Sequence, residues 1–154
     1  MNVRVREATD NDLGELLELY THLNNNVMPT TNERAEDVWT KIRKDANHHV
    51  IVAEYDGRIV SSCILLIVPN LTHNQEPYAL IENVVTHTDH RNRGFASAVL
   101  ESARDIAVGE GCYKISLMTG SKRDSTLRFY ENAGYNRNDK TAFIRWFSTP
   151  PKSD

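Results

Sequence analysis

The sequence predicts a single α+β domain in which helices flank a mixed β-sheet. Three observations support this prediction. Apolar residues alternate with polar ones in some segments, as in strands, and recur every three or four residues in others, as in helices. The segments follow one another in the order β-α-α-β-β-β-α-β-α-β, without a repeat or a linker. A length of 154 residues is usual for one domain.

The N-terminal part of the chain predicts one strand and two helices. Valine and arginine alternate over residues 3–8, as in a short strand. Leucines spaced by three and four residues predict a helix over residues 13–20. Asparagines and a proline within residues 24–31 end this helix, and a second amphipathic helix is expected over residues 32–44.

The middle of the chain predicts three strands. Apolar runs over residues 50–53 and 59–68 flank Asp56-Gly57, a pair that is typical of a tight hairpin turn. The apolar segment 80–86 predicts the next strand, although two polar residues interrupt it.

The C-terminal part returns to a helical period. Residues 94–109 predict a long helix, residues 113–118 a strand, and residues 124–133 a short helix that Gly134 ends. Alternation over residues 141–147 predicts a final strand.

We therefore expect the domain to span residues 1–148 and residues 149–154 to form a flexible tail. The large apolar side chains that are most simply assigned to the core are Trp39, Leu65, Ile67, Leu117 and Trp146.

Composition excludes several classes of protein. The 18 Lys and Arg against 21 Asp and Glu give a net charge of −3, which argues against nucleic-acid binding through a basic surface. No apolar run approaches the roughly 20 residues of a membrane helix, and the N-terminus lacks the apolar region of a secretory signal. Cys63 and Cys112 form no metal-binding pattern and are expected to be buried thiols. Together these features predict a cytoplasmic protein.

The most informative segment is Arg91-Asn92-Arg93-Gly94-Phe95-Ala96, which follows a strand and opens a helix. The first turn of a helix exposes unpaired N–H groups and about half a positive charge. Gly94 lets the main chain approach a ligand, Ala96 is small, and the arginines add positive charge. The segment suits a phosphate or pyrophosphate. A capped surface helix with solvated arginines is the alternative.

Two motifs resemble those of one family. Arg91-x-x-Gly94-x-Ala96 is similar to the R/Q-x-x-G-x-G/A signature of the GNAT acyltransferase superfamily, and the stretch 129–135, Phe-Tyr-Glu-Asn-Ala-Gly-Tyr, resembles its second signature. The resemblance implies an acetyl-CoA-dependent N-acetyltransferase. It also implies that a bulge separates the strand 80–86 from the strand 113–118, and that the pantetheine arm lies in the resulting slot. The cofactor-binding residues that it implies are Val84, Val85, Arg91, Asn92, Arg93, Gly94, Phe95 and Ala96.

Glu82 is the candidate general base for the attacking amine, acting directly or through a water. A carboxylate inside an apolar strand is unfavourable to bury without a partner or a function. The alternatives are a residue that faces solvent and a structural partner of Arg104 or Lys114.

Tyr130 matches the family tyrosine that donates a proton or hydrogen bond to the departing sulfur of CoA. A phenol with a reference pKa of about 10 is neutral at pH 7 and can donate. The alternative is a core aromatic residue beside Leu127. Because neither cysteine has a histidine partner in the pattern, we expect direct transfer without an acyl-enzyme. His87 and His90 are expected to face solvent, and no metal is expected.

The stretches 81–83, 111–115 and 129–131 are also similar to glucosamine 6-phosphate N-acetyltransferases, but Asn83 stands where that family has an acid. The acceptor is left open among small amines, amino sugars and peptide amines. The competing class is a non-catalytic acyl-CoA-binding regulatory module of the same fold. Pairing with a second copy as a homodimer, which is common in the family, is possible, and no nucleic-acid or membrane partner is expected.

Overall fold

A computed structural model of the protein describes residues 3–23, 26–29 and 32–149. Its centre is a five-stranded sheet in the order β1-β2-β3-β4-β5. Neighbouring strands are antiparallel except for β4 and β5, which are parallel. The predicted mixed sheet is therefore confirmed. The strands are β1 (Val3–Glu7), β2 (His48–Tyr55), β3 (Arg58–Val68), β4 (Tyr78–Thr86) and β5 (Ile115–Leu117).

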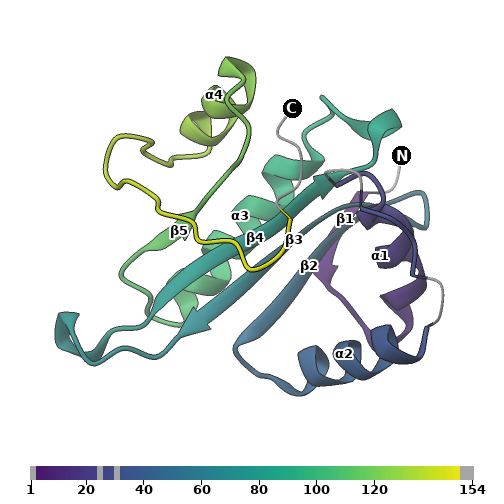
Figure 1. Ribbon diagram of the computed structural model, residues 1–154, viewed down its shortest axis with the longest axis horizontal. Helices are drawn as coiled ribbons and strands as arrows, with labels where there is room; N and C mark the ends of the chain where they lie inside the picture. Colours follow the sequence, from purple (N-terminus) through teal and green to yellow (C-terminus); the bar gives the residue numbers. More distant parts are fainter. Residues whose placement is uncertain (1–2, 24–25, 30–31, 150–154) are drawn as a thin grey trace.

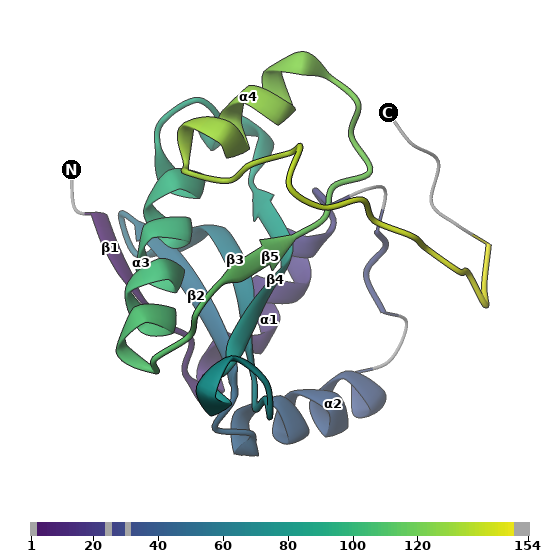
Figure 2. The same cartoon turned by 90° about the vertical axis from the view of Figure 1, so that its left-hand side faces the viewer.

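Helices cover both faces of this sheet. The helices α1 (Leu13–Tyr20) and α2 (Glu33–Lys44) lie on one face, and α3 (Phe95–Gly109) lies on the other (Figures 1 and 2). The short helix α4 (Asp124–Asn132) lies on the α3 side, where Phe129 and Tyr130 pack against the core beneath α3. All four predicted helices form within about a residue of their expected bounds.

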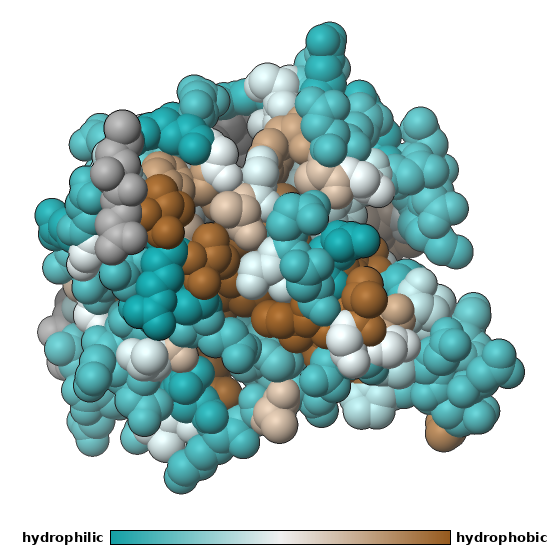
Figure 3. Space-filling model, turned by 180° about the vertical axis from the view of Figure 1, so that it is seen from behind, coloured by the Kyte–Doolittle hydropathy of each residue, from teal (hydrophilic) through white to brown (hydrophobic). Residues whose placement is uncertain are grey.

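Each face of the sheet has its own apolar core. The α3 face buries Leu65, Ile81 and Val99, and the α1/α2 face buries Leu16, Trp39 and Val52. Seen from behind, the surface is mostly polar and carries several apolar patches (Figure 3). No helix in the described ranges is both long and apolar enough to cross a membrane.

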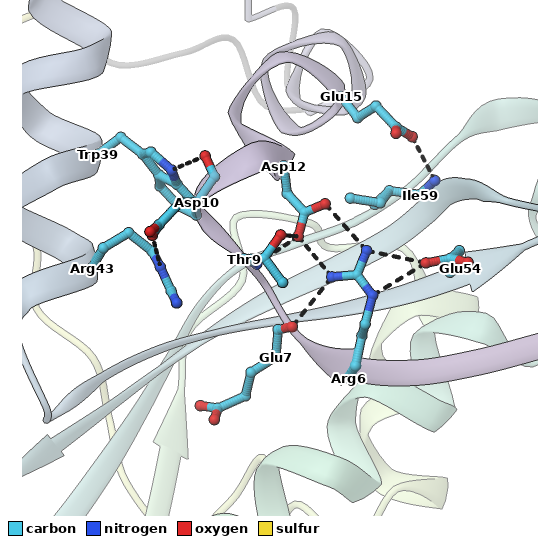
Figure 4. Close-up of polar contacts among 10 residues, drawn as sticks. All are labelled: Arg6, Glu7, Thr9, Asp10, Asp12, Glu15, Trp39, Arg43, Glu54 and Ile59. Carbon is cyan, nitrogen blue, oxygen red and sulfur yellow. Dashed lines mark hydrogen bonds and ion pairs between the residues drawn. The ribbon is translucent and has the colours of Figure 1, made fainter.

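An ion-pair network around Arg6 ties β1 to β2 and to the turn before α1 (Figure 4). Its guanidinium donates to Asp12 at 2.6 Å and to Glu54 at 3.0 Å, and the Asp12 side chain is only 9% exposed. Burial acts to raise the pKa of Asp12, but hydrogen bonds from Arg6 and Thr9 outweigh it, so the net pKa is lowered. The carboxylate form is thus favoured in the folded protein.

Replacing Arg6 with alanine is expected to lower the free energy of unfolding at pH 7 by about 3 kcal/mol, because Asp12 loses its charge partner while it stays buried. The pKa of Asp12 is lower in the folded protein than its ordinary value of 3.8. The ionised carboxylate therefore stabilises the folded protein at neutral pH, and this stabilisation is lost as the pH falls below 3.8 and through the pKa of the folded protein. The deficit should therefore shrink in acid. Urea denaturation at several pH values measures it, with the exposed Arg4→Ala as the matched control. Equal losses in both variants would contradict the role of Arg6.

The predicted final strand is wrong. Residues 141–147 form no strand, and in Figure 2 this yellow segment runs outward from the sheet. An alternating pattern makes a strand only where a neighbouring strand supplies hydrogen bonds, and β5 is the last strand of the sheet. Trp146, expected in the core, is 54% exposed, and Phe143 and Phe147 are 91% and 92% exposed.

Three of the five predicted core residues are buried. Trp39, Leu65 and Ile67 are buried as predicted, and Leu117 is half-buried. Within the polar break after α1, residues 24–25 and 30–31 lie outside the described residues. The predicted flexible tail, residues 149–154, also lies outside them except for its first residue.

Candidate active site on the open edge of β4

A β-bulge interrupts β4 at its polar residues. Ser62 of β3 pairs with Val85 and Ile64 pairs with Glu82, so one residue of β3 faces two residues of β4, Asn83 and Val84. Asn83 has a φ of 50°, a left-handed conformation that asparagine tolerates better than most residues. The bulge reverses the alternation along β4. The signal for it in the sequence is the asparagine within an otherwise apolar strand.

Beyond the bulge, β4 has an open edge. β5 pairs with β4 only from Ala79 to Ile81, so residues 82–86 have no strand beside them on that edge in the described structure. Val84 is half-buried against the α3 core, whereas Val85 is buried under α1 and α2. The bulge and the separation of the two strands, which the family resemblance implied, are both confirmed. An extended ligand can add to such an edge through main-chain hydrogen bonds.

The loop that enters α3 presents a set of free N–H groups. Asn92 and Gly94 have φ values of 58° and 83°, and α3 begins directly afterwards at Phe95. Within the described residues, the amides of residues 92–97 donate to no hydrogen-bond acceptor. Ala96 is half-buried, and Phe95 is only 5% exposed and anchors the helix in the core. Free amides and the positive end of a 15-residue helix make this loop suitable for an anion.

The loop arginines already have protein partners. Arg91 donates to the Thr86 carbonyl at 3.3 Å and to the His22 carbonyl at 3.4 Å, so it joins the end of β4 to the end of α1. The Arg93 guanidinium lies 4.6 Å from the centre of the Tyr55 ring. Both charges stay close to the loop, but their side chains are held against the protein. Anion binding at this loop therefore depends mainly on the main-chain N–H groups.

The loop histidines, which were expected to face solvent, do so only in part, because their rings also contact one another. The His22 and His87 rings are 4.1 Å apart, and His87 and His90 are 5.4 Å apart. Burial, then the neighbouring His87 and Arg91, lowers the pKa of His22 against the opposing effect of Asp89. In the described ranges no three His, Cys, Asp or Glu residues are arranged to hold a metal ion.

Glu82 lies on the α1/α2 face of β4. It pairs in register with Ile64, and paired residues project from the same face of a sheet. Contrary to the burial argument from sequence, Glu82 is exposed, as the alternative of a residue that faces solvent predicted. The alternative ion pairs do not form either, since Arg104 pairs with Asp105 and Lys114 lies over the Tyr78 and Tyr113 rings.

Tyr130 approaches from the opposite face. It packs against the α3 core, its ring centre is 5.0 Å from that of Phe129, and its hydroxyl makes no hydrogen bond to the described part of the chain. Burial, and then the nearby Cys63, raises the pKa of Tyr130, so its hydroxyl keeps its proton. The two candidate proton-handling groups, Glu82 and Tyr130, therefore lie on opposite faces of the bulged strand.

The two thiols are not activated. Cys63 is buried opposite the bulge and donates to the Val99 carbonyl at 3.6 Å, and burial raises its pKa to about 12. Burial, with a smaller effect from Glu110, also raises the pKa of Cys112. A thiol is a nucleophile only as a thiolate, so neither cysteine is suited to form an acyl-enzyme.

Comparison with known proteins decides the family. The sequence model of the acetyltransferase (GNAT) family matches residues 13–135. The chain belongs to the GNAT acetyltransferase family. Members of the GNAT family use acetyl-CoA as co-substrate, and this protein is an acyltransferase.

Relatives in the GNAT family match nearly the whole length of this chain. A glucosamine 6-phosphate N-acetyltransferase of Trypanosoma brucei is 29% identical over 91% of this chain and 93% of its own. The structure of an Agrobacterium tumefaciens protein, described provisionally as an acetyltransferase, superposes with a TM-score of 0.87 at 38% identity, covering 93% of this chain and 99% of that one. A Bacillus halodurans structure described as a transcriptional regulator has a TM-score of 0.83 at 29% identity, with 94% and 100% covered.

Proposed function

We propose that this protein transfers an acetyl group from acetyl-CoA directly to a primary amine within a ternary complex. The observation that carries the proposal is the open edge of β4, which runs from the bulge at Asn83 to the free amides of the loop that enters α3. In a chain of the GNAT family, this edge is the natural place for the extended arm of acetyl-CoA.

The cofactor-binding residues proposed from sequence have separable roles. The amides of Arg91, Asn92, Arg93, Gly94 and Ala96 bind the diphosphate of CoA, and Phe95 holds the first turn of α3 in place. The β4 main chain at Val84 and Val85 hydrogen-bonds the pantetheine arm. An N–H group near Val84 stabilises the negative charge that develops on the thioester oxygen. The amides of residues 92–96 support this assignment because they donate to no acceptor within the described residues, whereas the Arg91 amide donates to the Thr88 carbonyl at 3.5 Å and would have to exchange that bond for the ligand.

The proton chemistry follows from the two faces of β4. Glu82 accepts a proton from the ammonium group of the acceptor on the α1/α2 face, directly or through a water. Tyr130 donates to the departing sulfur from the α3 face, a role that suits a hydroxyl with a raised pKa. Protonated Cys63 and Cys112 support direct transfer rather than an acyl-enzyme.

The proposal is tested with the purified chain, acetyl-CoA and a panel of primary amines, following the release of free thiol. We expect thiol release that requires an amine, and no acetylated protein in the intact mass when the amine is omitted. An acetylated protein formed without acceptor would contradict direct transfer. Tight CoA binding with no turnover on any amine would instead support the non-catalytic regulatory module.

Replacing Gly94 with alanine is expected to weaken CoA binding at least about tenfold. Its φ of 83° disfavours a side chain by about 1–2 kcal/mol, and a Cβ there meets no protein atom within 4 Å, so it would project into the space where the ligand approaches. Gly111→Ala is the matched control, because Gly111 has a φ of 76° in equally open space after the other end of α3. Calorimetric titration with CoA compares the variants. Similar CoA affinities for both would contradict diphosphate binding at this loop.

We also propose that the protein forms a homodimer through its C-terminal segment. Phe143, Ile144, Trp146 and Phe147 are more than half exposed, and clustered exposure of this kind marks an interaction site. The segment has the pattern of a strand. In the described part of the chain no strand pairs with the outer edge of β5, and such a strand from a second copy can join an edge of this kind. Light scattering is expected to give the mass of a dimer. A monomer mass at micromolar concentration would contradict the proposal.

A further inference from the structure

A cavity of about 500 Å³ lies between α1, α2 and the sheet. This volume is in the range of small-molecule sites. Most of its wall is aliphatic, with leucines from α1 facing apolar residues of α2 and two strand residues forming its floor. The residues that matter most for its character are Leu13, Leu16, Leu17, Ala35, Val38 and Ile42.

The cavity reaches the candidate reaction site. Its wall includes Asn83 at the bulge, and its floor includes Ile64. Ile64 is the register partner of Glu82, so Glu82 projects from the sheet face that forms this floor. A molecule in the cavity can therefore place one end beside the open edge of β4 and the proposed base.

The cavity is poor in polar partners. Among the described residues that line it, Arg34 is the only one with a charge, and it makes no ion pair with them or with other described residues. Burial raises the pKa of Tyr20, against a smaller opposite effect of Ser62, so this phenol is neutral. A second ammonium group in the cavity would meet a cation and no carboxylate. The hydroxyl groups of a sugar would lose water with few partners to replace it.

We infer that the acceptor is a primary monoamine on an apolar chain or ring, with its amine at Asn83 and Glu82 and its apolar body between α1 and α2. This inference rests on the proposed acetyl transfer and names its substrate class. It disfavours polyamines through the charge of Arg34. It disfavours glucosamine 6-phosphate through the sugar hydroxyl groups alone, because Arg34 would attract the phosphate, and a relative acts on this sugar phosphate according to its name.

Matched substrates test the inference. n-Hexylamine and 1,6-diaminohexane have the same chain, and only the second places an additional charge in the cavity. We expect kcat/KM for n-hexylamine and 2-phenylethylamine to exceed that for 1,6-diaminohexane and for glucosamine 6-phosphate at least about tenfold. A preference for glucosamine 6-phosphate or the diamine would overturn the substrate class while leaving acetyl transfer intact. Turnover of no amine would contradict the proposed function itself.

Variants locate the apolar body of the acceptor. Ala35→Phe fills the cavity from α2 and is expected to raise KM for 2-phenylethylamine at least about tenfold, with the KM for acetyl-CoA within about twofold of the original. Ala35→Leu should give a smaller increase and guards against misfolding of the larger variant, which circular dichroism checks. Ala46→Phe adds the same ring at an exposed position after α2 that does not line the cavity. Unchanged KM values in both Ala35 variants would overturn the location.

Discussion

Replacing Tyr130 with phenylalanine is expected to lower kcat about 100-fold or more and to change the KM for acetyl-CoA little. The ring keeps its packing against the α3 core and beside Phe129, and only the hydroxyl is lost. Removing a group that protonates a leaving atom typically lowers the rate by about 10²–10⁴-fold. Steady-state kinetics with varied acetyl-CoA measures the effect.

Tyr113→Phe is the matched control for this variant. Tyr113 also loses only a hydroxyl, and it stacks on His73 at 4.0 Å, away from the bulge. Because the pKa of Tyr130 is raised above its ordinary value of 10, the wild-type hydroxyl keeps its proton throughout the neutral and mildly alkaline range. No loss of Tyr130-dependent rate is expected there. A kcat that equals the wild-type value in Tyr130→Phe would show that Tyr130 serves packing alone.

Replacing Glu82 with glutamine is expected to lower kcat about 100-fold at pH 7. Glutamine has the same size but cannot accept a proton, so the acceptor must lose its proton to solvent before it attacks. Because more of the amine is already neutral at higher pH, the deficit should shrink between pH 7 and pH 9. Glu82 is exposed and has no ion pair with another described residue, so the fold should tolerate the change.

Glu110→Gln provides the control for charge, since Glu110 is exposed beyond the C-terminal end of α3. A structural role for Glu82 predicts a lower Tm and a rate deficit that does not depend on pH. A role as base predicts an unchanged Tm and a deficit that depends on pH. The pH profile of kcat therefore separates the two, and a wild-type profile in Glu82→Gln would remove Glu82 from the mechanism.

Some sequence-based predictions about the site were wrong because they depend on contacts between distant segments. The burial argument for Glu82 rested on its place inside an apolar strand, whereas the folded protein leaves this side chain exposed. The loop arginines were expected to add charge to an anion site, and His87 and His90 were expected to face solvent. In the structure Arg93 lies over the ring of Tyr55, from the end of a distant strand, and both Arg91 and His87 contact His22, after α1. Nothing local to the loop reveals these neighbours.

The amino-acid sequence by itself determined the family, four helices and the hairpin, and it predicted that the loop at Gly94 binds an anion. These properties depend on local periodicity and on short contiguous motifs, so each can be recognised within a single segment of the chain. Only the tertiary structure decided on which face Val85 and Glu82 lie, that residues 141–147 form no strand, and that a cavity opens between α1 and α2. Those properties depend on the register of β4 against β3, on where β5 stops, and on how distant helices pack, and each is a relation between segments far apart in the chain.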